Sequence, residues 1–408
     1  MSNKIIIVGG GAAGMMAAIV AKRSGADVTI LERNNRVGKK LLATGNGRCN
    51  YTNIDLNIGN YHGRNPRFAY SALANLDVNQ TINLFERMGI TPAIEDNGKV
   101  FPLSFQSSSV LDVLRYEIED LGIDLITESY VVNVEKKREF IVTLKDGNRY
   151  RCDKLILATG GKAMPVSGSD GSGYTIAKSF GHNIIDVFPG LVQLNLEGNI
   201  FKQISGVKFP GVARLYSKDK LLLEDRGDIL FTNYGISGPP ILQISRTALE
   251  YMEKKRDIKL DISIIHTKNQ YELVEYLNRR FSYMPKKDIG EALIGLINKR
   301  LINPILREIN LDRNKKVSNI SKKEIYDLAH ILTSWKFNII GSQGWGQAQV
   351  TAGGVDTDEI DGQTMESKLV KGLYIVGELL DIDGDCGGFN LQWAWSSGYT
   401  AGVNAAQR

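Results

Sequence analysis

The segment Lys4-Ile5-Ile6-Ile7-Val8-Gly9-Gly10-Gly11-Ala12-Ala13-Gly14 decides the fold. Its apolar start predicts a buried strand, and the residues after it, 15–23, have the pattern of a helix. The glycines form Gly-x-Gly-x-x-Gly. Gly9 permits a tight turn, Gly11 lets the backbone approach a pyrophosphate, and Gly14 lets the helix pack against the strand. Because free N–H groups at a helix start attract phosphate, the segment predicts an adenine dinucleotide site, FAD or NAD alike.

A second strand and an acidic residue complete this pattern. Asp27–Leu31 is strand-like, and Glu32 ends it, 18 residues after Gly14. A carboxylate there is placed to accept hydrogen bonds from a ribose diol. A tight turn without a ligand would not need strand, glycines, helix, strand and acid in this order. The fold class predicted is therefore α/β, with a Rossmann-like nucleotide-binding domain.

Composition limits the other possibilities. A chain of 408 residues is expected to form two or three domains. No apolar run approaches the ~20 residues of a membrane span, and the N-terminus has no signal-peptide pattern, so we expect no membrane association. No cluster has zinc-ligand spacing, and the Asp-rich segment 381–385 lacks the downstream Glu of a calcium loop, so no metal site is expected. Three widely spaced cysteines favour a reducing cytoplasm: Cys49, Cys152 and Cys386.

The charge of +5 is unevenly distributed. Residues 200–340 hold 25 Lys and Arg against 16 Asp and Glu, a net charge of +9, which leaves −4 for the rest of the chain. Six basic pairs fall in this segment. Such a segment suits a polyanionic partner, and RNA binding there would weaken as salt rises. The alternative is a solvated helical surface rich in lysine, with a small-molecule substrate that needs none of these pairs.

The pattern along the chain predicts an interrupted domain. Strand-like runs return to the nucleotide site at 154–161 and 372–378, and a helix is expected over 391–406. Short strand-like runs between them indicate a β-barrel, and 268–330 is helical in pattern. The predicted division is a first part of the nucleotide-binding domain (1–190), a first part of the barrel (191–267), a helical insert (268–330), closing barrel strands (331–352) and the C-terminal part of the first domain (353–408).

Four blocks together resemble one family, the BaiN/RdsA-type NAD(P)/FAD-dependent oxidoreductases, which include aminoacetone-oxidase-like flavoproteins. The blocks are the glycine motif of residues 9–14, Thr44-Gly45-Asn46-Gly47-Arg48-Cys49-Asn50, Val350-Thr351-Ala352-Gly353-Gly354-Val355 and Gly387-Gly388-Phe389-Asn390-Leu391-Gln392-Trp393-Ala394. The resemblance spans essentially the whole chain. It implies FAD as the bound cofactor, NAD(P)H as a transient reductant, and an FAD domain of the two-dinucleotide-fold type split by a β-barrel and a helical subdomain.

The motifs and the resemblance together give a set of candidate cofactor-binding residues. They lie in the glycine motif, at the ends of the expected strands, in the 38–50 loop and at the start of the last helix, whose positive end suits the pyrimidine edge of a flavin. The candidates are Gly9, Gly11, Ala12, Ala13, Gly14, Glu32, Arg33, Lys40, Leu41, Gly45, Asn46, Gly47, Asn50, Val132, Ala158, Thr159, Gly160, Gly377, Glu378, Gly388, Phe389, Asn390 and Leu391.

Cys49 and Arg48 are the candidate catalytic residues. A thiol beside a flavin could protonate a substrate carbon opposite the face that receives hydride. The alternative for Cys49 is a buried, unreactive thiol, and for Arg48 a surface cation. Trp393 and Trp395 are expected to serve packing.

The family resemblance implies reduction of an activated C=C bond, and we expect ribosomal RNA uridine as the substrate, giving dihydrouridine. Two alternatives stay open. One is a small-molecule flavoenzyme, either an enone reductase or an amine oxidase that uses oxygen. The other is a flavin-containing RNA-binding protein without turnover. The sequence does not give the oligomeric state.

Overall fold

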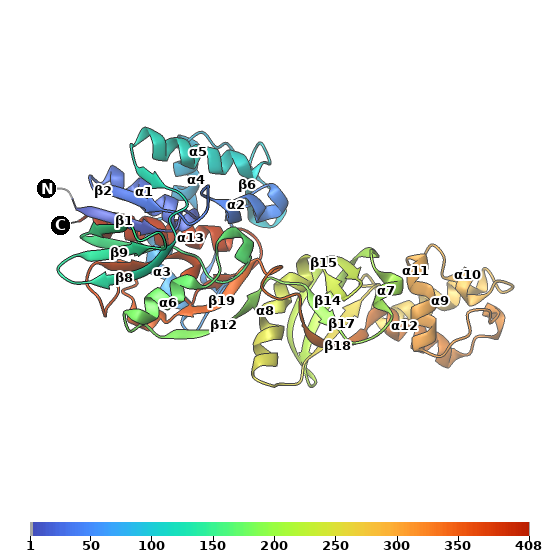
Figure 1. Ribbon diagram of the computed structural model, residues 1–408. Helices are drawn as coiled ribbons and strands as arrows, with labels where there is room; N and C mark the ends of the chain where they lie inside the picture. Colours follow the sequence, from blue (N-terminus) through green and yellow to red (C-terminus); the bar gives the residue numbers. More distant parts are fainter. Residues whose placement is uncertain (1–2, 408) are drawn as a thin grey trace. The chain divides into compact units, whose positions relative to one another are not determined.

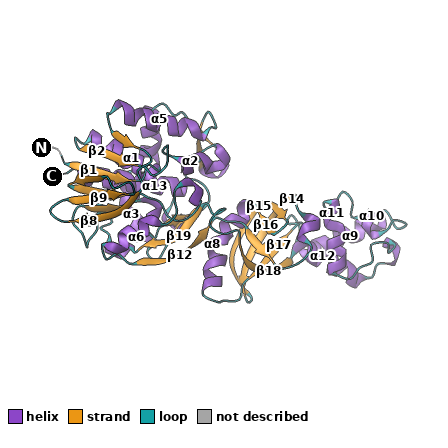
Figure 2. Ribbon diagram, viewed as in Figure 1, coloured by secondary structure: helices purple, strands orange, loops and turns teal. Residues whose placement is uncertain are grey.

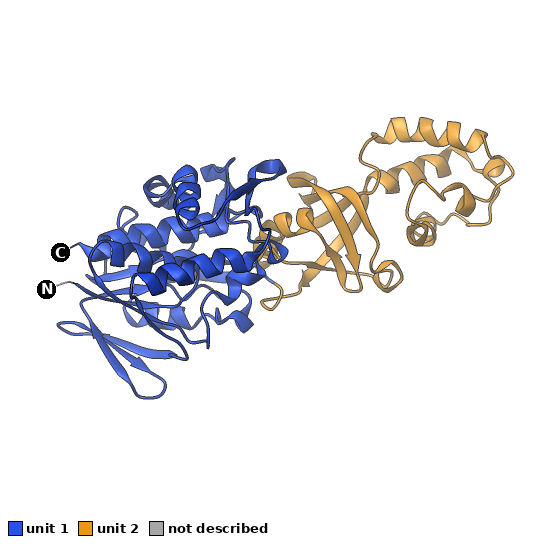
Figure 3. Cartoon of the chain, turned by 90° about the horizontal axis from the view of Figure 1, so that it is seen from above, with its two compact units in different colours: residues 1–189, 348–408 blue, residues 190–347 orange. Residues whose placement is uncertain are grey.

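A computed structural model describes residues 3–407. The chain forms two compact units, residues 1–189 with 348–408, and residues 190–347 (Figure 3). Among the described residues, no helix is long and apolar enough to cross a membrane.

A five-stranded sheet is the centre of the first unit (Figure 1). All its neighbouring strands are parallel, and Ile6, for example, lies between Leu155 and Thr29. The apolar runs of its inner strands are buried on both faces, as parallel sheets require. The strand order is β20 (Leu373–Ile375), β11 (Lys154–Leu157), β1 (Lys4–Val8), β2 (Asp27–Leu31) and β7 (Asp124–Ile126).

Two helices of this unit pack against each other, α1 (Ala12–Arg23) and α13 (Phe389–Ala406). Both consist largely of small and apolar residues and are buried over most of their length. The remaining helices are α2 (Lys39–Ala43), α3 (Ala69–Asn75), α4 (Val78–Arg87), α5 (Ser107–Asp120) and α6 (Ser172–Ser179), with short 3-10 turns between them.

Small sheets complete the first unit. Two three-stranded antiparallel sheets and two two-stranded sheets lie outside the central sheet, and β8 and β9 of the first of them are labelled in Figure 2. The strands are β8 (Val131–Lys136), β9 (Phe140–Leu144) and β10 (Arg149–Cys152), then β3 (Thr52–Asn53), β6 (Lys99–Pro102) and β5 (Pro92–Ile94), the pair β4 (Tyr61–His62) and β21 (Asp383–Gly384), and the pair β12 (Ile184–Gly190) and β19 (Val350–Val355).

The second unit contains the predicted barrel, which is closed and has six strands. Its interior is aromatic, with Phe231 in contact with Phe201, Trp335 and Phe337. The strand order is β13 (Leu194–Leu196), β16 (Gly235–Ser237), β15 (Lys220–Thr232), β14 (Lys208–Ser217), β17 (Lys259–Ser263) and β18 (Trp335–Ser342), and the short α7 (Phe201–Ile204) lies between β13 and β14 in sequence.

The helical insert follows β17 and precedes β18, as the sequence predicted. Leu273, Leu277 and Phe281 recur every fourth residue on one helix and are buried, which explains why this segment is helical. Its helices are α9 (Gln270–Ser282), α10 (Ile289–Ala292), α11 (Lys299–Glu308) and α12 (Lys322–Thr333).

Two expectations about the barrel region were wrong. Residues 239–253 form a helix, α8 (Pro239–Glu253), where strand-like runs were expected. The two prolines occupy the first turn, where a missing N–H costs nothing because the N–H groups of that turn have no acceptor within the helix. The last expected barrel strand is β19, which pairs with β12 in the first unit instead. The second unit therefore ends near residue 347 rather than 352.

Candidate functional site

The predicted cofactor residues gather at one edge of the central sheet. In parallel strands the carboxyl ends share an edge, and ligands of open α/β sheets bind there. Four adjacent strands each lead into predicted cofactor residues at this edge. Gly377 and Glu378 follow β20, residues 158–160 follow β11, the glycine motif follows β1, and Glu32 and Arg33 follow β2.

The glycine motif has the geometry that the sequence predicted. Gly9 has φ of +108°, and a Cβ atom on it would lie 2.5 Å from the carbonyl oxygen of Ala158. A Cβ on Gly14 would lie 1.9 Å from the oxygen of Gly9. By contrast, a Cβ on Gly11 would meet nothing within 4 Å. Gly11 caps α1 without any side-chain hydrogen bond, so the helix start is open to a ligand.

Glu32 is buried and already has partners. One carboxylate oxygen accepts the N–H of Gly10 at 2.8 Å, and the other accepts the backbone and side-chain N–H groups of Asn34. These bonds hold the acid beside the glycine motif. A ribose hydroxyl would share these oxygens.

Arg33 lies next to it and pairs with Asp170 at 2.5 Å, with its guanidinium 4.4 Å from the ring centre of Tyr130. Burial acts to raise the pKa of Asp170, but the hydrogen bonds from Arg33 and Ser172 outweigh it and lower that pKa. Arg33 is thereby held across the loops that follow β2 and β11.

The loop after α2 has an unusual backbone. Gly45, Asn46, Gly47 and Cys49 all have positive φ, between 56° and 81°. A Cβ on Gly45 would lie 2.8 Å from the nitrogen of Asn50, so this tight path requires glycine. This run of positive φ values falls in the Thr44–Asn50 block, and such backbone conformations are common at functional sites.

Of the two interpretations of Cys49, its surroundings favour the buried, unreactive thiol. Its side chain is 0% exposed. Burial raises its pKa to about 12, against a lowering contribution from the Thr44 hydrogen bond. This environment favours the alternative, an inert thiol that fills space.

Arg48 is partly exposed and lies on the ring of Phe101, 4.2 Å from its centre, with an ion pair to Glu95 at 2.8 Å. Its catalytic role stays a prediction.

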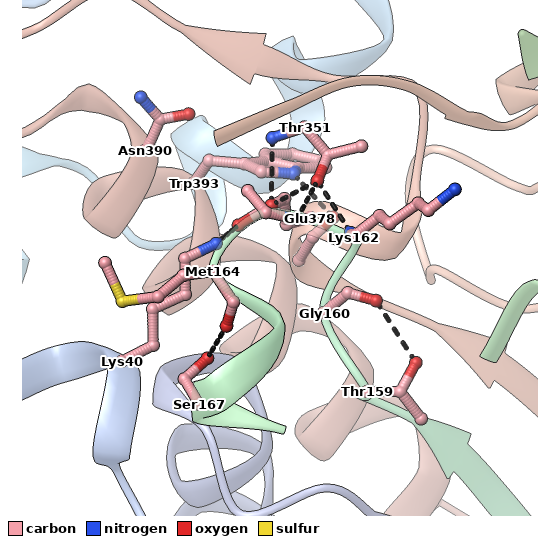
Figure 4. A network of polar contacts seen from close by, with 12 residues as sticks. Lys40, Thr159, Gly160, Lys162, Met164, Ser167, Thr351, Glu378, Asn390 and Trp393 are labelled. Carbon is pink, nitrogen blue, oxygen red and sulfur yellow. Dashed lines mark hydrogen bonds and ion pairs between the residues drawn. The ribbon is translucent and has the colours of Figure 1, made fainter. Parts of the chain in front are cut away.

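A polar network joins four segments that are distant in sequence, around residues 40, 162, 351 and 378 (Figure 4). One carboxylate oxygen of Glu378 accepts a hydrogen bond from Lys40 Nζ at 2.5 Å. The other accepts hydrogen bonds from the backbone N–H and the hydroxyl group of Thr351, at 2.9 and 2.7 Å. Thr351 Oγ1 in turn accepts the backbone N–H groups of Lys162 and Ala163. The sequence analysis missed Thr351 as a site residue, although it lies in one of the four family blocks.

The start of α13 is also open. Gly388 caps it with φ of 100° and without a side-chain hydrogen bond, and no acidic residue occupies the first turn. A Cβ on Gly388 would lie 2.4 Å from the oxygen of Thr52. Asn390 bonds back to both backbone groups of Gly384, at 2.8 and 2.7 Å, which fixes the preceding loop. Trp393 and Trp395 are buried, so their predicted packing role is confirmed.

The contacts between α1 and α13 determine how far apart the N-termini of the two helices lie along the helix axis. Gly398 faces Ala13, and Gly402 faces Ala17, so the helices run in the same direction. The first residue of α13, Phe389, precedes Gly398 by nine positions, which is about 13 Å of helix. One positive helix end thus lies at the glycine motif, and a second lies further along. This spacing suits an extended ligand with a pyrophosphate at one point and an electron-rich ring at the other.

Two buried hydroxyls near this edge have no hydrogen-bond partner in the protein, those of Tyr174 and Ser169. Burial raises the pKa of Tyr174 above its usual range, and the charges of Glu378 and Asp381 add to the effect. A Cβ on Gly160 would lie 2.8 Å from Ser169 Oγ. Unpaired buried polar atoms call for a partner, and the hydroxyls and phosphates of FAD would supply one. The residues present therefore fit FAD.

Three further candidates are placed less centrally. Leu41 is buried in α2, Asn50 accepts the N–H of Val100 at 3.2 Å, and Val132 is 49% exposed on β8. Their contacts with a cofactor stay predictions. Residues 3–407 contain no group of three or more His, Cys, Asp or Glu arranged to hold a metal ion.

Comparison with known proteins identifies the family. The family model described as HI0933-like protein Rossmann domain matches residues 3–404. A 3-dehydro-bile acid delta(4,6)-reductase of Clostridium scindens is 38% identical over 408 residues, which is 100% of both chains. Ribosomal RNA dihydrouridine synthases of Haemophilus influenzae and Escherichia coli are each 32% identical, over 99% and 97% of this chain and 98% and 96% of theirs.

The family resemblance of the four sequence blocks is thus confirmed, and so is the predicted α/β fold with its inserted barrel and helices. The chain belongs to the HI0933-like family and is an FAD-dependent oxidoreductase.

Proposed function

We propose that this enzyme uses NAD(P)H to reduce an activated C=C bond, and that its substrate is a uridine in ribosomal RNA. The ring C=C of uridine gains a hydride that originates from NAD(P)H and a proton from a donor acid or water. The products are dihydrouridine and NAD(P)⁺. Cys49, Cys152 and Cys386 are not joined in disulfide bonds, which agrees with a reducing cytoplasm as the place of action.

The redox part of the proposal rests on the two open helix ends of α1 and α13. FAD, when bound, supplies two-electron transfer between NAD(P)H and the substrate. The N–H groups at Ala12 and Ala13 would hold the pyrophosphate, and those at Phe389 and Asn390 would face the ring edge that gains negative charge on reduction. Neither helix has an acidic residue in its first turn to compete for these groups.

The choice of RNA as the substrate rests on the surface of the helical insert. Its cations largely lack carboxylate partners, and three of its tyrosines, Tyr271, Tyr283 and Tyr326, are 72%, 75% and 56% exposed. Cations with exposed aromatic rings are what single-stranded RNA binds, through phosphate neutralisation and base stacking. The names of the relatives from Haemophilus influenzae and Escherichia coli point the same way.

A second candidate function is reduction of a small-molecule enone. It is favoured by the 38% identical relative from Clostridium scindens, whose name describes a bile-acid reductase. The same redox site would serve both substrates, because each offers a C=C bond activated by a carbonyl group. The basic insert would then be a solvated surface.

Purified, FAD-loaded enzyme separates the two candidates. It is incubated without oxygen with NADH or NADPH and, in parallel, with unmodified ribosomal RNA or a 3-oxo-4-ene steroid acid. The proposal expects dihydrouridine by mass spectrometry of the digested RNA and oxidation of the nucleotide only when RNA is present. Rapid turnover of the steroid acid with unchanged RNA would establish the second candidate instead.

A further inference from the structure

The end of helix α9 carries a group of cations around an exposed tyrosine. We call Arg279, Arg280, Tyr283, Lys286 and Lys287 the α9-end cluster. Tyr283 follows Arg279 by four residues and Arg280 by three, so the three side chains lie on neighbouring positions of one helix face. Tyr283 is 75% exposed, so its ring face is accessible to a base that could stack on it.

Lysine and arginine at a helix end can simply satisfy its carbonyl groups. Arg280 does not do this. Its Nε and Nη2 donate to the carbonyl oxygens of Ala292 and Ile294, at 3.1 and 2.9 Å, outside α9. The guanidinium plane is therefore fixed in one orientation, as a rigid flat cation.

This fixed guanidinium lines a pocket of about 290 Å³. Met284 and Ile294 give it apolar walls, and Lys287 and the carboxylate of Glu291 also line it. The volume is near the lower end of the roughly 300–1,000 Å³ typical of small-molecule sites, so it suits one flat ring better than an extended ligand. An arginine plane beside apolar walls is a surface on which unstacked RNA bases bind.

The surrounding charges are available for phosphate. Within residues 3–407, Arg279, Lys286 and Lys287 form no ion pair with a carboxylate. Other cations of the insert differ: Lys315 pairs with Glu324 at 2.7 Å, and Lys316 with Asp288 at 2.8 Å. Arg279, Lys286 and Lys287 thus belong to the cations of the insert that have no carboxylate partner, and they lie next to the pocket and Tyr283 in sequence.

We infer that the α9-end cluster is a docking site for single-stranded RNA. One unpaired base lies in the pocket on the face of Arg280, a neighbouring base stacks on Tyr283, and Lys286 and Lys287 neutralise the adjoining phosphates. This inference rests on the proposed function, because it names the surface by which the enzyme would hold its RNA substrate.

The test measures binding of a fluorescent, uridine-containing single-stranded RNA oligonucleotide to the FAD-loaded, full-length enzyme over a range of salt concentrations. Lys286→Gln with Lys287→Gln should weaken binding and reduce the slope of log K against log salt by roughly 1.4, about 0.7 for each lost phosphate contact. Tyr283→Ala should weaken binding roughly tenfold while leaving this slope unchanged, since stacking releases no counterions.

The matched control is Lys145→Gln with Lys371→Gln, two exposed lysines of the first unit without an ion pair. The control should bind as the wild type does, and circular dichroism should show all variants folded. Wild-type affinity in both cluster variants would overturn the inference. Tighter binding of polyglutamate than of RNA by the intact cluster would overturn it too, because the surface would then fit an acidic protein.

The outcomes separate the two proposals. Dihydrouridine formation by a wild-type enzyme whose cluster variants bind and react normally would overturn the docking site and leave the proposed function standing. Loss of RNA binding in the cluster variants, with no dihydrouridine from the wild type, would support the docking site and refute the proposed function.

Discussion

A Cβ atom on Gly398 would lie 2.4 Å from the carbonyl oxygen of Ala13, closer than any real contact of this kind. Gly398 in α13 therefore lets the helix approach α1 directly at the glycine motif. Gly402 repeats the arrangement one turn later, 2.6 Å from the oxygen of Ala17. These two glycines set the register of the helix pair, and with it the spacing of the two open helix ends.

Gly398→Ala should disturb both the fold and the cofactor. The added methyl must push α13 away from α1, at a cost of about 1–3 kcal/mol, and this moves the two helix ends relative to each other. We expect a lower thermal midpoint and weaker FAD binding, measured by calorimetry and flavin fluorescence. Gly346→Ala is the control, because a Cβ there meets nothing within 4 Å. Equal behaviour of the two variants would contradict the proposed register.

Gly11→Ala should separate cofactor binding from stability. Its φ of −82° is accessible to alanine, and the added Cβ meets no protein atom within 4 Å. The apoenzyme should therefore keep its thermal midpoint. FAD should bind roughly tenfold or more weakly, since the methyl occupies the approach to the pyrophosphate and even ~1.4 kcal/mol gives that factor. Unchanged FAD affinity would show that the phosphates lie elsewhere.

Cys49→Ala should leave catalysis intact. The side chain has no exposed surface and burial raises the pKa of its thiol to about 12, as expected of a thiol that only fills space. We expect wild-type kcat, slow reaction of Cys49 with thiol reagents in the native enzyme, and a loss of about 1 kcal/mol in stability from the small cavity. A variant that is folded and FAD-loaded yet inactive would restore the general-acid interpretation.

The Lys315–Glu324 pair should make the stability of the helical insert depend on pH. Hydrogen bonds from Lys315 and from Ser321 lower the pKa of Glu324 from 4.5 to about 2. Because the native pKa is the lower one, the pair stabilises the fold above about pH 4.5, and this stabilisation is lost as pH falls toward 2.

Glu324→Gln keeps a helix-capping side chain but removes the charge. Its destabilisation should be up to about 1 kcal/mol near neutral pH, since solvent screens the pair, and should vanish near pH 2. The measurement is the thermal midpoint of the wild type and of Glu324→Gln at several pH values between 2 and 7. A difference that is independent of pH would mean that the ion pair contributes nothing.

The sequence was most informative where a local pattern has a single structural meaning. The strand, glycines and Glu32 predicted the first βαβ unit and its open helix end, because each glycine there answers a backbone or packing constraint that sequence spacing reveals. The helical pattern predicted for 268–330 has the same kind of basis, since Leu273, Leu277 and Phe281 recur every fourth residue and are buried on one face of α9.

It was less informative where tertiary contacts decide. Pro239 and Pro240 lie within the segment predicted to belong to the barrel, but they begin helix α8, because a first helical turn tolerates proline. Thr351 gave no local signal as a site residue; only the fold brings it to Glu378, 27 positions away. The burial of Cys49 likewise follows from packing around a loop with positive φ rather than from its neighbours in sequence.

Ribosomal RNA from a strain that lacks this gene tests the central claim most directly. Mass spectrometry would compare its dihydrouridine content with that of the parent strain and of strains complemented with the wild type or with Gly11→Ala. The account predicts that one or more dihydrouridines disappear in the deletion strain, return with the wild-type gene, and return only partly with the variant. An unchanged dihydrouridine content in the deletion strain would contradict it.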